Sequence, residues 1–355
     1  MSTWRQGLGY LLALSLLLVS LIGLTACRST GTYSATFLDS FDTVLTVTVG
    51  ASDHIAADKI ISDVHAIVTD LHARFDIYNP HTFEDGTVGL YDVNRAAGNG
   101  EALPVHEDIL ALLRLGQEMY ALSQGKVNVM MGAVLRLWHD ARMAGDRLPD
   151  SNALEEAGGH CAIESLVIEE NVGTGGARVS ITDPNASIDV GAIAKGYVMD
   201  RVLACARAEG VASMLVNLGG HVLAIGNHPD GDPWQVSVPD PREEGAFMRF
   251  DVTDASIVTS GDYERVFTLD GVAYHHLIDP ITGYPATTYR AVTVILPHAL
   301  TREADGYSTS LFLLSHEEGA ALLTAAAAQM DGARDVVRAV WFSADGETFT
   351  YPNGG

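Results

Sequence analysis

Two oxygen-bearing side chains near the C-terminus have the types and the spacing to hold a metal ion. Asp305 and Thr309 are four residues apart, so on a helix both oxygens would face the same side. A carboxylate and a hydroxyl are poor ligands for zinc, but they suit Mg²⁺, which accepts oxygen ligands and keeps room for a substrate phosphate. An acidic residue near a helix N-terminus and a threonine bonded back to its own helix give the same pattern. The pair alone therefore indicates either a Mg²⁺ site or an ordinary helix start.

A lysine follows a strand-like segment at the point where we expect a helix to begin. The segment reads Asp189-Val190-Gly191-Ala192-Ile193-Ala194-Lys195-Gly196-Tyr197, and its small residues would let the backbone approach a ligand closely. The free N–H groups and the positive dipole of a helix N-terminus suit phosphate oxygens, and Lys195 would stand beside them. The alternative is a capped helix that carries a surface lysine.

The densest group of polar residues lies between positions 260 and 285. Ser260-Gly261-Asp262-Tyr263-Glu264-Arg265 is followed by His275-His276-Leu277-Ile278-Asp279 and then by residues 280–285. Adjacent histidines on their own are more often structural than catalytic. Two further segments could contribute to a site, but their residues indicate it less specifically. They are residues 75–79, after a long helix, and residues 125–132.

Hairpins and helices must position these segments. Alternating apolar residues and threonines predict a strand over 44–49, and apolar residues at helical spacing predict an amphipathic helix over 55–74. We expect further helices over 104–122, 192–209 and 304–328, and hairpins over 165–182, 214–226, 265–279 and 339–351. Hairpins mixed with helices favour an α+β fold, a single compact domain with an antiparallel or mixed sheet and flanking helices.

The composition excludes several classes of protein. The 355 residues carry 45 acidic and 21 basic side chains, a formal charge of −24, which argues against nucleic-acid binding and against docking of the folded body on anionic lipid. Such a length buries a full core without disulfide or metal staples. Phosphate-loop, Gly-x-Ser-x-Gly and His-Glu-x-x-His motifs do not occur in the sequence, which excludes the standard proteins built on them.

Cys161 and Cys205 could form a disulfide in an exported protein or remain as two buried thiols.

The N-terminus is typical of a secretory signal. Arg5 precedes an uncharged apolar run that ends Leu24-Thr25-Ala26-Cys27. This ending resembles a lipobox, which implies cleavage before Cys27 and lipid attachment to its sulfur. A retained anchor helix is the alternative, since the run is near the lower length limit for a membrane span. The expected parts are a signal peptide over 1–26, the lipidated Cys27 with its linker over 27–36, and one folded domain over 37–355.

Five motifs in a fixed order resemble the ApbE family of FAD:protein FMN transferases. The resemblance extends from about Asp42 to Thr309, and a lipobox is common in this family. It implies a domain with an ApbE-like, T-fold-like architecture. The motifs are the 189–200 block, Asn217-Leu218-Gly219-Gly220, Ser260-Gly261-Asp262-Tyr263, residues 276–285 and residues 305–309.

The resemblance also implies which residues contact the ligands. It assigns Mg²⁺ to the backbone carbonyl of Ala192 and to the side chains of Asp305 and Thr309. It assigns FAD to Phe41, Tyr78, Lys126, Val127, Asn128, Asp189, Lys195 and Ile278. Three positions depart from the common family pattern, and we interpret Asn128, Met130 and Ser308 as subfamily differences.

The implied reaction moves FMN from FAD to a Thr or Ser hydroxyl of a target flavoprotein and releases AMP. Mg²⁺ and Lys195 would neutralise the pyrophosphate, and either His276 or Asp279 would take the hydroxyl proton. Because FAD is an anion and the chain is strongly acidic, we expect a strict metal requirement. Two alternatives remain open: an FAD pyrophosphatase that gives FMN and AMP, and a non-catalytic flavin-binding lipoprotein.

The expected partners also follow from the resemblance. The family modifies exported FMN-binding domains, including subunits of sodium-pumping quinone reductases and Rnf-type complexes. We therefore expect a lipid-anchored enzyme on the extracytoplasmic face of the bacterial cytoplasmic membrane.

Overall fold

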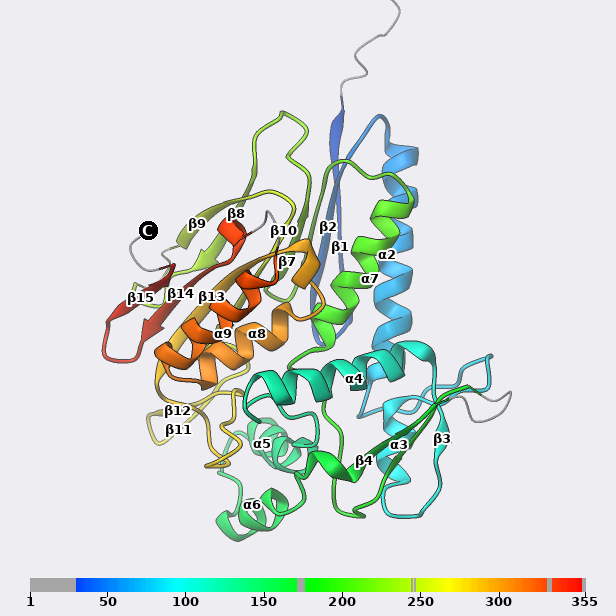
Figure 1. The fold of residues 1–355 in the computed structure, drawn as a ribbon, viewed down its shortest axis with the longest axis vertical. Coiled ribbons are helices and arrows are strands. Elements are labelled where there is room, and N and C mark those ends of the chain that lie inside the picture. Colours follow the sequence, from blue (N-terminus) through cyan, green and yellow to red (C-terminus); the bar gives the residue numbers. More distant parts are fainter. Residues whose placement is uncertain (1–29, 171–175, 244, 246, 331–333, 353–355) are drawn as a thin grey trace, which may run out of the picture.

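A long antiparallel sheet runs through the molecule and carries helices on one face (Figure 1). The computed structural model describes residues 30–170, 176–243, 245, 247–330 and 334–352. Each strand of this eight-stranded sheet pairs antiparallel with its neighbours. In spatial order the strands are β1 (Gly31–Ser40), β2 (Thr43–Ala51), β6 (Met214–Leu218), β7 (His221–Ile225), β10 (Ala255–Gly261), β13 (Tyr289–Pro297), β14 (Arg338–Ser343) and β15 (Thr348–Tyr351).

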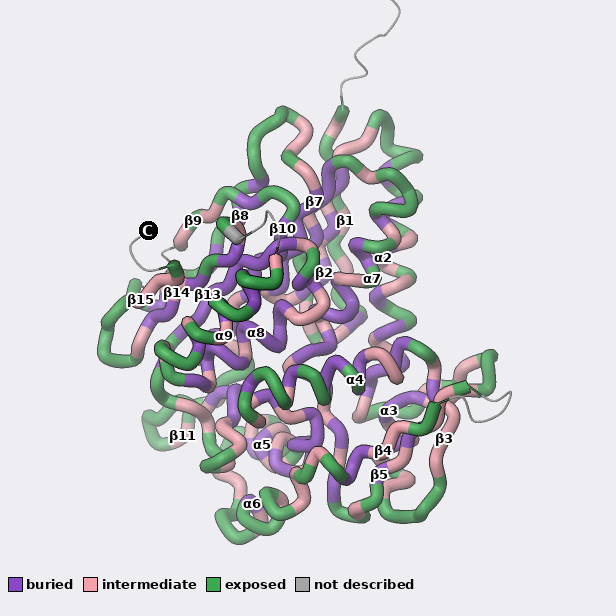
Figure 2. Tube along the Cα trace, viewed as in Figure 1, coloured by how far each residue is buried: buried purple, intermediate pink, exposed green. Residues whose placement is uncertain are grey.

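Two pairs of helices cover this sheet. Helices α2 (His54–Phe75) and α7 (Ala194–Ala208) pack together near β1, β2 and β7, and α8 (Ala304–Leu313) packs on β10 and β13 beside α9 (His316–Ala328). Helix α2 begins where the Asp53 side chain accepts from the Ala56 N–H, and its Ile60, Val64 and Leu71 are buried. Figure 2 shows that buried residues concentrate where the sheet meets these helices.

A smaller group of elements closes one end of the molecule, below the main sheet in Figure 1. It contains a three-stranded sheet with the order β3-β5-β4. Two separate two-stranded ribbons, β8 (Trp234–Pro239) with β9 (Phe247–Val252) and β11 (Phe267–Leu269) with β12 (Val272–Tyr274), flank the main sheet. The elements of the closing group are α3 (Leu90–Arg95), β3 (Leu103–Pro104), α4 (Glu107–Leu122), α5 (Gly132–Ala144), α6 (Ser151–Gly158), β4 (Leu166–Glu169) and β5 (Arg178–Ile181). Short 3₁₀ turns lie at Ile163–Ser165, His298–Leu300 and Arg334–Val336.

The structure confirms the α+β class and most of the expected elements. The strand over 44–49, the helix over 55–74 and the four hairpins are present, although residues 171–175 of the 165–182 hairpin lie outside the described residues. Two helix boundaries were wrong. Residue 104 belongs to β3, and α4 begins only at Glu107, where the His106 ring accepts from the Asp108 N–H. The helix over 304–328 is two helices, because Ser315 forms a capping box with Glu318 that starts α9.

The expected linker is partly wrong. Residues 31–36 are strand rather than linker, since β1 pairs with β2 from Gly31 onward and the Ser34 and Thr48 hydroxyls lie 2.8 Å apart. The signal segment and Cys27 lie outside the described residues. Within the described residues, no helix has both the length and the apolar content to cross a membrane. Cys161 and Cys205, which both lie within the described residues, are free thiols. The expected alternative of a disulfide between them is therefore wrong.

Candidate active site

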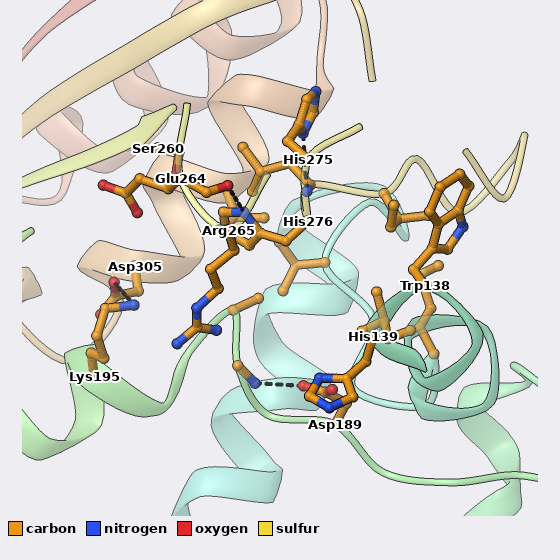
Figure 3. A pocket seen from close by; sticks show the side chains of 18 of the residues that line it. Trp138, His139, Asp189, Lys195, Ser260, Glu264, Arg265, His275, His276 and Asp305 are labelled. Carbon is orange, nitrogen blue, oxygen red and sulfur yellow. Dashed lines mark hydrogen bonds and ion pairs between the residues drawn. The ribbon is translucent and has the colours of Figure 1, made fainter. Parts of the chain in front are cut away.

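A cavity of about 400 Å³ lies where the main sheet, α7 and α8 meet α5 and the β11–β12 ribbon (Figure 3). The fold brings residues to it from across the chain, and it is lined by most of the residues expected to bind FAD or Mg²⁺ or to take the hydroxyl proton. Phe41 and Asp279 do not line it. The expected residues that line the cavity are Tyr78, Lys126, Val127, Asn128, Asp189, Ala192, Lys195, His276, Ile278, Asp305 and Thr309.

Asp305, in the first turn of α8, is the best-held carboxylate of the cavity. It is only 4% exposed, and its two oxygens have different partners. Oδ1 lies 3.2 Å from Lys195 Nζ, and Oδ2 lies 2.9 Å from His221 Nδ1. Burial by itself would raise the pKa of Asp305, but the Lys195 ammonium and the hydrogen bond with His221 hold this pKa at about 2. The carboxylate is therefore ionised, and its pocket-side oxygen already attracts a cation.

The start of helix α7 faces the same cavity. Ala192 and Lys195 line it, and no side chain caps the helix at its N-cap residue, Ile193. The N-terminus of α7 thus places a positive dipole beside the Lys195 ammonium. Figure 3 shows the Arg265 guanidinium reaching into the space between Lys195 and Asp189. Two cations and a helix N-terminus converge here, a combination that suits phosphate oxygens.

The adjacent histidines differ in their bonding. Both ring nitrogens of His275 are used, because Nε2 donates to the Ala286 carbonyl at 2.8 Å and Nδ1 accepts from the Leu277 N–H. His276 Nδ1 donates to the Glu264 carbonyl at 3.0 Å, which leaves Nε2 as the acceptor nitrogen. Burial, helped by the nearby Arg265 charge, lowers the pKa of His276 to about 3. His276 is therefore a neutral imidazole with a free acceptor, whereas His275 is structural.

Asp279 lies behind the cavity rather than in its wall. Its Oδ1 lies 3.0 Å from Lys126 Nζ and also accepts from the Ile281 N–H. Both bonds are made by the same oxygen, and they hold the 276–285 loop against Lys126. Of the two residues expected to take a proton, only His276 lines the cavity.

Phe41 sits in the β1–β2 turn, next to the cavity residue Asp42. The turn has φ of 55° at Phe41 and 51° at Asp42, the left-handed region that residues with a side chain rarely adopt. The Phe41 ring packs edge-on against His72, and the Phe41 carbonyl accepts from Arg265 at 3.3 Å. Phe41 thus supports Arg265 and aims Asp42 at the cavity.

Stacked rings form the opposite wall. Tyr78 lies 4.7 Å from the ring of His139 in a stacked pair, and the Arg136 guanidinium lies over the Tyr78 ring. The Asp76 carboxylate holds the Tyr78 loop by accepting the backbone N–H groups of Tyr78 and Asn79. Trp138 stacks on Tyr274 of the ribbon. The sequence patterns do not indicate the roles of His139 and Trp138, which α5 brings to the cavity.

Two further carboxyl groups face the cavity. Burial raises the pKa of Asp189, whose Oδ1 accepts from the Gly191 N–H at 2.8 Å. Burial also raises the pKa of Glu264, which lies in the field of Asp305, Lys195 and Arg265. The Glu264-Arg265 pair lies in the polar segment that begins at Ser260, but no sequence pattern indicates a role for it.

The three departures from the family pattern are accommodated by local bonding. The Asn128 side chain donates to the Cys161 carbonyl and accepts from the Met130 N–H, so it stabilises its own loop. Met130 is fully buried in the core. Ser308 is also fully buried, and its hydroxyl lies 2.7 Å from that of Ser260.

The oxygen atoms that line the cavity fit a Mg²⁺ ion. They do not fit a metal that needs three or more side-chain ligands. In the part of the chain that the structure describes, no group of three or more His, Cys, Asp or Glu side chains is placed to hold a metal. The cavity instead offers the ionised carboxylate of Asp305, with the Thr309 hydroxyl one helical turn later and Ala192 nearby. Such a small set of hard oxygen donors suits a Mg²⁺ ion that completes its shell with water and substrate phosphates.

Comparisons with known proteins agree on one family. A family model described as the ApbE family matches residues 41–332. A FAD:protein FMN transferase of Treponema pallidum is 35% identical over 249 residues, covering 66% of this chain and 67% of that protein. A Klebsiella pneumoniae protein of the same name is 30% identical over 237 residues, covering 66% and 71%.

Solved structures show the same fold. The ApbE protein of Thermotoga maritima has a TM-score of 0.73 at 25% identity and covers 90% of this chain and 96% of that one. The Pseudomonas stutzeri flavinyl transferase ApbE has a TM-score of 0.71 at 28% identity and covers 90% and 93%. The expected ApbE-like architecture is confirmed.

Proposed function

The chain belongs to the ApbE family, and we propose that it transfers FMN from FAD to a Thr or Ser hydroxyl of a target flavoprotein and releases AMP. The observation that carries the proposal is the convergence of an ionised carboxylate, two cations and a neutral imidazole on one cavity. The activity for which the relatives are named supports the choice of FAD and of a protein as the two substrates.

The cations of the cavity bind and orient the pyrophosphate of FAD. Lys195 and Arg265 would pair with its oxygens, and the N–H groups at the start of α7 would donate hydrogen bonds to the remaining phosphate oxygens. The ring wall of Tyr78 and His139 offers stacking surface for an aromatic part of the dinucleotide. Positioning and charge stabilisation then account for most of the catalysis, as in other phosphoryl transfers.

The bond changes are those of a single displacement at phosphorus. The acceptor oxygen forms a bond to the phosphorus on the FMN side, and the bond from that phosphorus to the AMP oxygen breaks. The hydroxyl proton goes to His276 Nε2, the free acceptor in the cavity wall. Because His276 is neutral, it can accept this proton without first losing one.

Asp305 and Thr309, with the Ala192 carbonyl, would hold a Mg²⁺ ion. When bound, this ion would offset the charge of the pyrophosphate. Lys195 sits on the pocket-side oxygen of Asp305 and is free to turn to the substrate phosphates when that oxygen takes another cation. The net charge of −24 makes such local positive charge necessary for an anionic substrate.

The proposal extends to where the enzyme acts. Cleavage before Cys27 and its lipidation would tether the folded domain to the extracytoplasmic face of the membrane, where exported FMN-binding domains are the natural acceptors. In cells that process lipoproteins, Cys27→Ala should release the protein from the membrane fraction. A variant that stays membrane-bound would contradict the anchor.

The activity can be tested with the full chain in detergent. We expect incubation with FAD, Mg²⁺ and a purified FMN-binding domain to give flavin fluorescence on the acceptor band after a denaturing gel. Free FMN and AMP without a labelled band would replace this proposal with an FAD pyrophosphatase. Bound but unchanged FAD would instead indicate a flavin-binding lipoprotein.

A further inference from the structure

A fully buried histidine stands directly behind the candidate metal carboxylate. His221, the first residue of β7, has no exposed surface, and its Nδ1 lies 2.9 Å from Asp305 Oδ2. The two residues are 84 positions apart in the chain. Because an ionised carboxylate can only accept, Nδ1 carries the hydrogen and donates.

The other side of the imidazole is tied into the scaffold. His221 Nε2 lies 3.2 Å from the Ser256 hydroxyl of β10, and that hydroxyl donates to Thr301 Oγ1 at 3.1 Å. Ser256 and Thr301 are both fully buried. The chain of bonds therefore crosses from β7 through β10 to the turn that precedes α8, and it leaves the ring of His221 little freedom to rotate.

This bonding makes the two oxygens of Asp305 unequal. Oδ2 is held from the protein interior, whereas Oδ1 points to Lys195, whose side chain is 24% exposed and lines the cavity. A cation arriving from the cavity meets Oδ1 alone. Mg²⁺ favours contact with one carboxylate oxygen in a tight octahedral shell, whereas Ca²⁺ readily takes both oxygens of a carboxylate.

We propose that His221 is a positioning residue that restricts Asp305 to one pocket-facing oxygen and thereby makes the site selective for Mg²⁺ over Ca²⁺. This inference rests on the proposed function, because it concerns the same metal carboxylate. Neither the five sequence motifs nor the relatives' names indicate a role for His221 or a preference for Mg²⁺ over Ca²⁺. Its chemistry is that of a hydrogen-bond partner behind a metal ligand, and loss of such a partner typically weakens metal binding about 10- to 100-fold.

Two substitutions separate the bond to Asp305 from the bond to Ser256. The amide nitrogen of His221→Asn can take the place of Nδ1 and keep the bond to Asp305. The longer His221→Gln places its amide near the position of Nε2 and keeps the bond to Ser256 instead. Both replacements are neutral and polar, so the pair controls for the loss of the ring itself. His298→Asn, at a half-buried histidine bonded to the Ala224 carbonyl, is a matched control outside the cavity.

The measurement is Mn²⁺ binding by electron paramagnetic resonance, with Mg²⁺ and Ca²⁺ as competitors, on the full chain saturated with FAD and without an acceptor. We expect His221→Gln to bind Mn²⁺ and Mg²⁺ about 10- to 100-fold more weakly and to lose most of its preference for Mg²⁺ over Ca²⁺. His221→Asn and His298→Asn should both stay close to the wild type. A purely structural role would lower the melting temperature of both His221 variants and leave the ratio of Mg²⁺ to Ca²⁺ affinity unchanged.

Two results would overturn the inference in different ways. If the wild type transfers FMN and the Gln and Asn variants bind Mn²⁺ alike, the role of His221 is wrong and the proposed function stands. If the wild-type complex with FAD binds no Mn²⁺ at all, both the metal-dependent reaction and the role of His221 are wrong.

Discussion

The two walls of the cavity are built by different physical means. On the wall formed by the sheet and α8, Asp305, His221 and Ser256 are nearly or fully buried and bonded to one another. On the wall formed by α5 and the loop after α2, Tyr78 is 37% exposed and is held by ring stacking on His139. The first wall has fixed bond directions, and the second has adaptable surface.

This contrast separates chemistry from binding. Buried hydrogen bonds fix a charged group within a narrow range of positions, which a reaction at phosphorus needs. Stacked rings tolerate sliding and mainly contribute contact area. We therefore expect substitutions in the sheet wall to lower kcat or metal affinity, and substitutions in the ring wall to raise KM for FAD.

The largest effect should come from Asp305→Asn. Removal of the ionised carboxylate that pairs with Lys195 and His221 should lower the transfer rate by about 10³-fold, because a catalytic metal is worth several kcal/mol at the transition state. FAD should still bind through the ring wall, which equilibrium dialysis can measure. Unchanged release of AMP by this variant would contradict the idea that the sheet wall carries the chemistry.

Lys195→Met should have the next largest effect. Loss of this cation should lower kcat on the order of 10²-fold, as for the removal of one preorganised donor. Because Lys195 pairs with Asp305 Oδ1, its loss should also make Mn²⁺ bind more tightly when FAD is absent. Weaker Mn²⁺ binding in the variant would contradict this competition.

His276→Ala and Asp279→Ala form a matched pair. The first should lower kcat by about 10²-fold, the lower range for loss of a general base, and added imidazole should restore part of the rate. Asp279→Ala should have a small effect on kcat, because Asp279 does not line the cavity and its carboxylate pairs with Lys126. Near-normal rates for both variants, with FAD and Mg²⁺ saturating, would exclude both as the proton acceptor.

Tyr78→Leu tests the ring wall. Loss of one stacked pair should raise KM for FAD about 3- to 10-fold and leave kcat nearly unchanged. Steady-state kinetics at saturating acceptor give both constants. A fall in kcat as large as that of His276→Ala would show that the ring wall also aligns the reacting atoms.

The smallest expected change concerns pH. Because burial and Arg265 lower the pKa of His276 to about 3, its imidazole should stay neutral from pH 8 down to pH 5, and lowering the pH in this range should not consume the base. The NMR signal of the His276 ring should therefore not shift across this range. A titration with a midpoint near 6.5, the ordinary value for histidine, would contradict the buried, neutral base.

Local patterns predicted much of this site, and long-range contacts did not follow from them. The spacing of Asp305 and Thr309 and the strand-to-helix segment that ends at Lys195 are local features, and all three residues line the cavity. The bond from His221 to Asp305 depends on how β7, β10 and α8 meet, which no short pattern in the chain encodes.

Some of the missed features had local signals. The break between α8 and α9 follows from the Ser315 to Glu318 capping box, which has a readable spacing. The stack of Tyr78 on His139 joins residues 61 positions apart and has no such signal. Chemistry-bearing motifs were therefore predictable one by one, whereas the pairing of the two walls required the fold.

The most direct test is the intact mass of an acceptor domain after reaction with the full chain, FAD and Mg²⁺, measured together with the AMP released. We predict that the acceptor gains the mass of one FMN less one water, with one AMP formed for each acceptor labelled, and that Asp305→Asn abolishes both signals. AMP and free FMN with an unmodified acceptor, or a labelled acceptor with no AMP, would contradict the account.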